Sequence, residues 1–137
     1  MKTETFAWPV RVYYEDTDAQ GVVYYANYFR FMERARTEWL RALGVDQVAM
    51  MEQERRIFVV TETKAEFIAP ARFNDQVVVT ARLAGLTRAT FDIEQNIYLD
   101  SLDGALVLRG SVRAACLNAD TLRPTRVPAS IFEGTTS

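Results

Sequence analysis

The chain has 137 residues, a net charge of −2 and no histidine, with 49% hydrophobic and 25% charged residues. This length and composition predict one soluble globular domain over residues 1–137, with no overall attraction to nucleic acid. The absence of histidine excludes Ser-His-Asp and Cys-His catalysis and histidine metal sites. The single cysteine, Cys116, excludes an intramolecular disulfide and a thiolate zinc cluster, and its alternating apolar surroundings predict a core position.

Targeting and membrane signals are missing from the sequence. The first ten residues, MKTETFAWPV, lack the apolar stretch of a signal peptide, and no apolar run reaches the ~18 residues that a membrane helix needs. We therefore expect a cytoplasmic protein with no membrane span.

The N-terminal third changes its hydrophobic period once. Residues 6–16 alternate, with Val10, Val12 and Tyr14 on one face, which predicts a half-buried strand. From residue 26 to residue 43 the apolar positions follow helical spacing instead, and Gly44 is placed for a left-handed C-terminal cap. The predicted buried face consists of Tyr28, Phe31, Met32, Ala35, Trp39, Ala42 and Leu43, and the predicted exposed face carries Arg30, Glu33, Arg34, Arg36, Glu38 and Arg41. A second, short helix is expected within residues 45–56.

The remainder of the chain has the pattern of a β-sheet. Strands are predicted at 57–69, 75–86, 89–100 and 105–119, with a hairpin turn at SLDG (101–104). One face of such a sheet needs an apolar cover, and the helix at 26–43 is the only long amphipathic element available. The predicted fold is therefore α+β: a curved antiparallel sheet of about five strands around one long central helix. The tail forms a short helix at 128–133 at most, and we expect partial disorder from about residue 129.

The connection EDTDAQG, residues 15–21, carries the chemistry. Its ordinary interpretation is a polar loop in which Asp and Gly serve turn geometry and helix capping. A calcium loop is disfavoured, because its twelfth position is Asn27 and a strand precedes it. A catalytic interpretation rests on the helix that follows, since the unpaired N–H groups of a helix start stabilise a developing oxyanion. A carboxylate beside such a donor, without a general acid, suits a leaving group that departs unprotonated, and a thiol of pKa about 8.5 meets that requirement.

The string VYYEDTDAQGVVYYANYFRFMERARTEWLRALG, residues 12–44, closely resembles the hotdog-fold acyl-CoA thioesterases of the 4-hydroxybenzoyl-CoA thioesterase group, and most of all their Tol-Pal-associated branch. The likeness continues more weakly to about residue 120. It implies a hotdog fold and an acyl-CoA thioesterase that needs no cofactor and no metal, and that assembles as a homodimer or homotetramer with active sites at subunit interfaces.

The resemblance also implies roles for particular residues. Asp18 would be the nucleophile or the general base toward water, and the backbone N–H of Tyr25 the oxyanion donor. Many members of the branch carry histidine at the Tyr25 position, where only the backbone role carries over. The residues expected to line the substrate site are Gly21, Tyr28 and, from the partner chain, Val60, Thr61 and Glu62.

Several alternatives stay open at this point. Glu33 is a second candidate nucleophile, although Arg30 and Arg36 are simple ion-pair partners for it at i, i+3 spacing. Asp16 is expected to orient the loop. The candidates for contacts with CoA phosphates are Lys64, Arg72, Arg88 and Arg113. The alternative function is a module that binds acyl groups or acyl carrier protein in connection with phospholipid synthesis, with weak turnover; a hotdog dehydratase would need the missing histidine.

Overall fold

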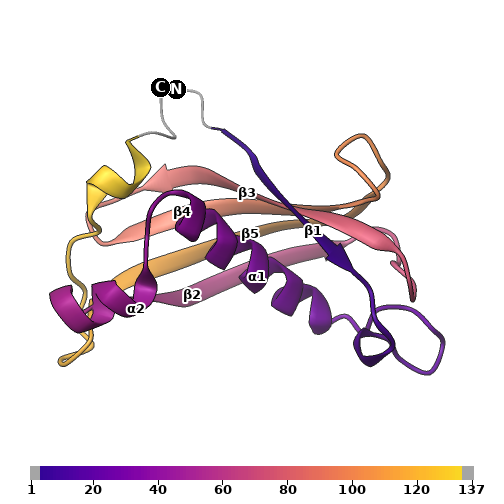
Figure 1. Ribbon diagram of the computed structural model, residues 1–137, viewed down its shortest axis with the longest axis horizontal. Helices are drawn as coiled ribbons and strands as arrows, with labels where there is room; N and C mark the ends of the chain where they lie inside the picture. The colour runs from indigo at the N-terminus through magenta and orange to yellow at the C-terminus, as the bar shows by residue number, and fades with distance from the viewer. Residues whose placement is uncertain (1–3, 134–137) are drawn as a thin grey trace.

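The computed structural model describes residues 4–133, in which a five-stranded antiparallel sheet curves around the helix α1, Asn27–Ala42 (Figure 1). The strands lie in the order β1-β3-β4-β5-β2, so that β1 and β2 form the two edges. Their bounds are Phe6–Arg11 for β1, Arg56–Phe67 for β2, Gln76–Leu86 for β3, Thr90–Leu99 for β4 and Leu106–Asn118 for β5. The predicted hotdog architecture is confirmed.

Helix α1 forms because its apolar side chains share one face, and it ends where the sequence predicts. Val45 N–H donates to the Leu40 carbonyl and Gly44 N–H to that of Arg41, while Gly44 has a φ of +90°. These bonds complete a Schellman cap. Tyr28, Phe31, Met32, Ala35 and Trp39 are buried as predicted, together with Leu40.

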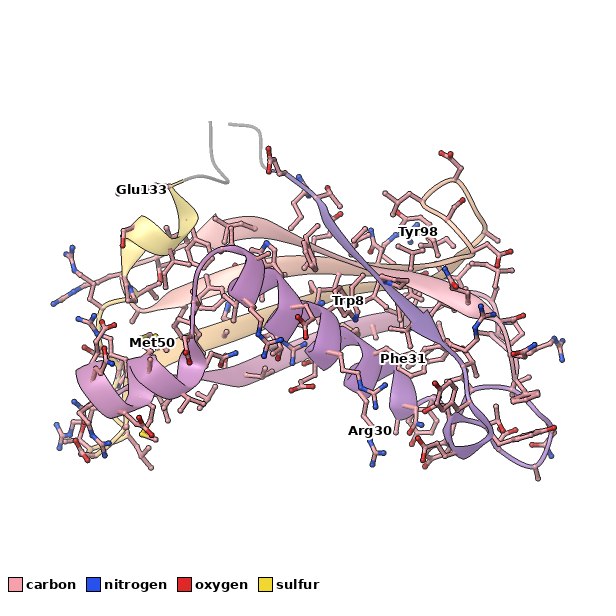
Figure 2. The ribbon with its side chains drawn as sticks, in the orientation of Figure 1. Trp8, Arg30, Phe31, Met50, Tyr98 and Glu133 are labelled. Carbon is pink, nitrogen blue, oxygen red and sulfur yellow. The ribbon has the colours of Figure 1, made fainter. Side chains whose placement is uncertain are left out.

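Three positions of α1 differ from the prediction, among them Glu38, which is partly buried and not exposed. Ala42 is exposed because the helix ends there and the last turn leaves the sheet. Arg36, placed by the helical pattern on the solvent face, is instead half-buried and bonds to Gln95 of β4. Arg30, by contrast, extends clear of the sheet (Figure 2).

Strand β1 ends at Arg11, five residues earlier than the alternating pattern predicts. Val10 and Val12 are buried, but Tyr14–Asp16 forms the 3-10 turn η1 and Tyr14 is 74% exposed. The turn forms because the Asp16 carboxylate accepts the N–H of Tyr13 and competes with continued strand pairing.

Three short helical elements, α2, η2 and η3, complete the described part of the chain. The helix expected within 45–56 consists of α2, Gln47–Ala49, followed by one π-helical stretch, η2, at Met50–Glu54. Near the C-terminus, η3 is a 3-10 helix at Ala129–Phe132, and Phe132 is 1% exposed against the ring of Trp39. The predicted partial disorder from about residue 129 stays a prediction, and residues 134–137 lie outside the described residues.

The core lies between the concave face of the sheet and α1. Strand β4 contributes alternate residues, Phe91, Ile93, Gln95 and Ile97, all at most 1% exposed. Gly110 of β5 lies tightly under α1 and against β4: an added Cβ would lie 3.0 Å from Met32 Cε of the helix and 2.8 Å from the Gln95 carbonyl oxygen of the neighbouring strand. The edge strand β2 is more exposed, with Val60 at 46% and Phe67 at 50%.

Candidate active site

The acidic loop between β1 and α1 is a small hairpin anchored on residues 71–75. Asp18 N–H donates to the Val22 carbonyl, Tyr24 N–H donates to that of Asp16, and Thr17 bridges to Val23 in antiparallel fashion. The N–H of Val23 in turn donates to the Ala71 carbonyl. The loop is therefore held by backbone bonds on both sides, which fixes where Asp18 is presented.

Asp16 is the structural carboxylate of the loop. It is 6% exposed, its Oδ2 accepts the N–H of Tyr13 at 2.9 Å, and its Oδ1 accepts Nδ2 of Asn27 at 3.0 Å. Both oxygens are thus engaged with the protein. The expectation that Asp16 orients the loop agrees with this geometry.

Asp18 is exposed and presents its carboxylate at the tip of the hairpin. Oδ1 accepts the N–H of Gln20 at 2.9 Å, an Asx-turn bond within the loop itself, and the Asp18 carbonyl accepts the N–H of Gly21. Within residues 4–133, no other hydrogen bond or ion pair engages this carboxylate. Oδ2 is therefore open to a ligand.

Gly21 is required by the backbone of this turn. Its φ is +78°, in the left-handed region that side chains disfavour, and an added Cβ would meet no atom within 4 Å. The sequence analysis predicted that Gly21 allows the backbone to approach the substrate closely. In the structure, its positive φ is what requires a glycine at this position. A contact between Gly21 and the substrate stays a prediction.

The start of α1 offers free backbone donors. Ala26, the N-cap residue, provides no side-chain cap, and the N–H of Asn27 donates to the Tyr24 carbonyl. In the described part of the chain, the N–H groups of Tyr25 and Ala26 have no acceptor. The positive end of the helix dipole adds to these two donors, so an oxyanion is favoured at this point.

An exposed aromatic cluster surrounds the helix start. The ring of Tyr25, 57% exposed, lies 4.9 Å from that of Tyr24 and 6.0 Å from that of Phe67, and Phe29 lies 6.4 Å from Phe67. A hydrogen bond with the Tyr25 side chain raises the pKa of Tyr24 above its usual value of about 10. The Tyr24 phenol therefore keeps its proton more tightly than a free tyrosine, and the exposed rings of the cluster offer an apolar surface.

Tyr28, expected to contact the substrate, has a clear packing role. It is 4% exposed, its ring lies 6.0 Å from that of Phe67, and its hydroxyl accepts the N–H of Ala71 at 3.1 Å. Burial raises the pKa of Tyr28 more than the Ala71 bond lowers it. The hydroxyl supports the loop that carries Asp18, and a substrate contact for Tyr28 stays a prediction.

Val60, Thr61 and Glu62 lie in the middle of β2, where a bulge at Thr61 interrupts the pairing with β5. Five residues separate Glu62 from Phe67, or roughly 17 Å along a strand. Phe67 is the β2 residue that touches Tyr25. One protomer therefore does not bring these three residues to Asp18, as expected if a partner chain supplies them.

The basic residues that are candidates for contacts with CoA phosphates differ in whether they already form an ion pair. Lys64 pairs with Glu62, and Arg113 with Asp92, whereas Arg72 and Arg88 have no ion pair among the residues that the structure describes. Glu33 also lacks the ion pairs expected from its spacing, because Arg30 points to solvent and Arg36 turns toward Gln95.

Residues 4–133 contain no group of three or more metal-ligating side chains placed to hold an ion. None of their helices is long and apolar enough to cross a membrane.

Sequence reasoning missed one polar cluster and one apolar one. Gln95 is fully buried and links Arg36 to the carbonyls of Met32 and Thr80, and its place in phase with Phe91, Ile93 and Ile97 was the available signal. The contribution of Phe67 to the aromatic cluster had no sequence signal, because it depends on where β2 ends.

Comparisons with known proteins identify relatives of the chain. The chain is 40% identical over 131 residues to the acyl-CoA thioester hydrolase YbgC of Escherichia coli O6:H1, with 96% of each chain covered. It is 36% identical to the acyl-CoA thioesterase YbgC of Haemophilus influenzae, covering 96% of this chain and 94% of that one.

Solved structures share the fold. A probable thioesterase from Bartonella henselae has a TM-score of 0.84 at 32% identity, covering 91% of this chain and 100% of the other. A 4-hydroxybenzoyl-CoA thioesterase carrying an Asp-to-Asn substitution, bound to 4-hydroxybenzoyl-CoA, has a TM-score of 0.88 at 20% identity over 96% and 99% of the two chains; this likeness concerns the fold. The thioesterase-like superfamily itself matches residues 12–134, so the resemblance carried by residues 12–44 is confirmed and the chain belongs to that superfamily.

Proposed function

We propose that the chain is an acyl-CoA thioesterase in which Asp18 acts on the thioester carbonyl and the Tyr25 N–H stabilises the oxyanion. The observation that carries the proposal is the loop geometry: an exposed carboxylate with an open oxygen, anchored beside a helix start whose first donors have no acceptor. The acyl-CoA thioester hydrolases among the relatives support the choice of substrate class.

The chemistry fits a site without histidine. In the nucleophilic route, an oxygen of Asp18 attacks the carbonyl carbon, the C–S bond breaks and CoA leaves as a thiolate; water then hydrolyses the acyl-aspartyl anhydride to free acid. In the alternative route, Asp18 takes a proton from the attacking water. We favour the first, because a carboxylate is a weak base toward water, whereas a thiolate leaves without a general acid.

The two routes differ in whether Asp18 becomes acylated. Borohydride added during a single turnover reduces an anhydride and converts the Asp18 carboxyl to an alcohol, which mass spectrometry of the loop peptide detects. The alcohol in wild type supports the nucleophilic route. Unmodified Asp18 under conditions where CoA is released in a burst supports the general-base route.

The proposal includes a homodimer, or a homotetramer built from it. Strand β2 is a 12-residue edge with one unpaired side, and such an edge is a template for pairing with another strand. A twofold axis crossing β2 halfway between Thr61 and Phe67 would set Thr61 of one copy beside Phe67 of the other. Val60, Thr61 and Glu62 would then reach the second copy's Asp18 loop, and exposed Val60 and Phe67 would be covered.

The experiment is hydrolysis by Asp18→Asn across a panel of acyl-CoA thioesters, with CoA release followed by a thiol reagent. We expect kcat/KM to fall by at least about 100-fold with the fold retained, the effect of losing a positioned catalytic group. Glu15→Gln, an exposed carboxyl on the same loop, is the matched control and should stay near wild type. Near wild-type turnover by Asp18→Asn would exclude Asp18 from the reaction, and tight binding of an acylated carrier protein without turnover would favour the binding module.

A further inference from the structure

A cavity of about 190 Å³ lies between α1 and the inner faces of β2, β4 and β5. Its floor is apolar, formed by Phe58, Phe91 and Ile93, and its rim carries Arg36 and Thr37 of α1. At ~30 Å³ for each water-sized group, the space holds about six such groups. This cavity is separate from the Asp18 loop of the same protomer, because Arg36 lies 11 residues beyond Tyr25, or roughly 17 Å along a helix.

The Arg36 guanidinium faces this cavity with donors to spare. Its one hydrogen bond in the described part of the chain is from Nη1 to Oε1 of Gln95, at 3.0 Å. No carboxylate lies within ion-pair distance of it, whereas six other arginines in residues 4–133 are each paired with a carboxylate. Among the described side chains no fully buried polar atom is left without a partner, so the other Arg36 N–H groups reach accessible space.

The partly buried position is unfavourable for the positive charge of Arg36 when no ligand is bound. Burial lowers the pKa of Arg36, and the field of nearby Glu33 offsets this only in part. A half-buried guanidinium bonded to a neutral amide keeps most of its desolvation cost, which an oxygen acceptor entering the cavity would offset. The free N–H groups of Arg36 beside the cavity are therefore suited to bind a ligand that carries an oxygen acceptor.

Val60 connects this cavity to the proposed active site. It lines the cavity, and the pairing of β2 with its copy would place it beside Phe67 and the Asp18 loop of the second copy. An acyl group attached to that copy's thioester would therefore meet the cavity as it extends past Val60.

We propose that this cavity holds the far end of the acyl group bound at the second copy's Asp18, and that Arg36 selects acyl groups carrying a hydroxyl there. The inference rests on the proposed thioesterase function. Arg36 donates to the hydroxyl oxygen, and Thr37 or the exposed carboxylate of Glu33 accepts its proton. A terminal methyl, by contrast, leaves the Arg36 donors unpaired.

The test compares straight-chain acyl-CoA thioesters of increasing length, each against its terminally hydroxylated counterpart. At the length that reaches Arg36, wild type should prefer the hydroxylated member by about tenfold in kcat/KM, the size of one hydrogen bond to a charged donor. Arg36→Met keeps the side-chain length and removes the donors, so the preference should disappear. Arg34→Met, exposed on the same helix, should keep it.

A second variant covers the case in which Arg36→Met fails to fold. Ala114 is 4% exposed and lines the cavity, so Ala114→Leu fills it from β5; kcat/KM should fall for the longer thioesters while the shortest is spared. Ser111→Leu, at an exposed position on the opposite face of the same strand, is the control. Two outcomes would overturn this inference: an unchanged hydroxyl preference in Arg36→Met, or an unchanged dependence on chain length in Ala114→Leu. If turnover still depends on Asp18 in either case, the proposed thioesterase function stands. Absence of turnover on every thioester overturns the proposed function itself.

Discussion

Asn27 donates from Nδ2 to Oδ1 of Asp16 at 3.0 Å, which ties the first residue of α1 to the loop that carries Asp18. Both side chains are buried, at 8% and 6% exposure, so the bond is shielded from water. The proposed nucleophile, Asp18, and the proposed oxyanion donor, Tyr25, both lie between these two residues along the chain. The positions of Asp18 and Tyr25 relative to one another therefore depend on this bond.

Asp16→Ala and Asn27→Ala should each lower the free energy of unfolding by about 1–3 kcal/mol, because each leaves a buried polar partner unsatisfied. The double variant should lose less than the sum, by at least about 0.5 kcal/mol, because the second change removes a group that is already unpaired. Urea denaturation of the four proteins measures this coupling. Additive losses would mean that the 3.0 Å bond contributes nothing of its own.

Two substitutions of Tyr25 distinguish the role of its backbone N–H from that of its phenol. Tyr25→Phe keeps the N–H and the ring, so kcat should stay within about threefold of wild type, whereas Tyr25→Pro removes the N–H and should lower kcat by at least about 100-fold. The N–H has no acceptor among the described residues, so its loss breaks no hydrogen bond of the fold. Circular dichroism checks that the proline variant is folded. A large loss in Tyr25→Phe would assign the effect to the phenol instead.

The fold was predictable where burial alone decides the structure. The helix at 26–43 and four strand positions followed from periodicity, and the structure places them at Asn27–Ala42 and within one or two residues of the expected strand ends. The N-terminal strand was overextended because the Asp16 carboxylate ends it at Arg11 through a side-chain bond, and alternation of apolar residues contains no information on such a bond.

The site was predictable only as far as it is local in sequence. Asp18, Gly21 and Tyr25 lie in one continuous string, so their shared position at the start of α1 could be inferred. Arg36 and Gln95 are 59 residues apart, and a helical pattern that places arginine on the solvent face cannot reveal a buried acceptor on β4. A polar residue in phase with an apolar strand face, as Gln95 is, was the one signal available.

Cys116 should make stability depend on alkaline pH. Its side chain is 0% exposed, and burial raises the pKa of the thiol, although the field of Arg56 opposes this. The folded state therefore holds the proton more tightly, so the contribution is complete below the unfolded pKa of about 8.5 and is lost as pH rises above it. Unfolding free energies between about pH 7 and about pH 10 should fall more steeply in wild type than in Cys116→Ala.

The same burial should keep Cys116 from reacting with a thiol reagent until the protein unfolds. The native protein should therefore add no background to a CoA-release assay, and the denatured protein should react with one equivalent, since Cys116 is the single cysteine. Equal pH slopes in wild type and Cys116→Ala, or fast labelling of the native protein, would contradict the buried environment.

Gly110→Ala tests how tightly β5 packs against α1 and the neighbouring strand β4. The added Cβ would lie 2.8 Å from the Gln95 carbonyl oxygen, a backbone atom that cannot rotate away, and 3.0 Å from Met32 Cε. Overpacking of this kind should lower the free energy of unfolding by about 1–3 kcal/mol. Ser111→Ala, the next residue on the exposed face of β5, should change it by no more than about 0.5 kcal/mol. A fully stable Gly110→Ala would contradict the close packing of β5 against β4 and Met32.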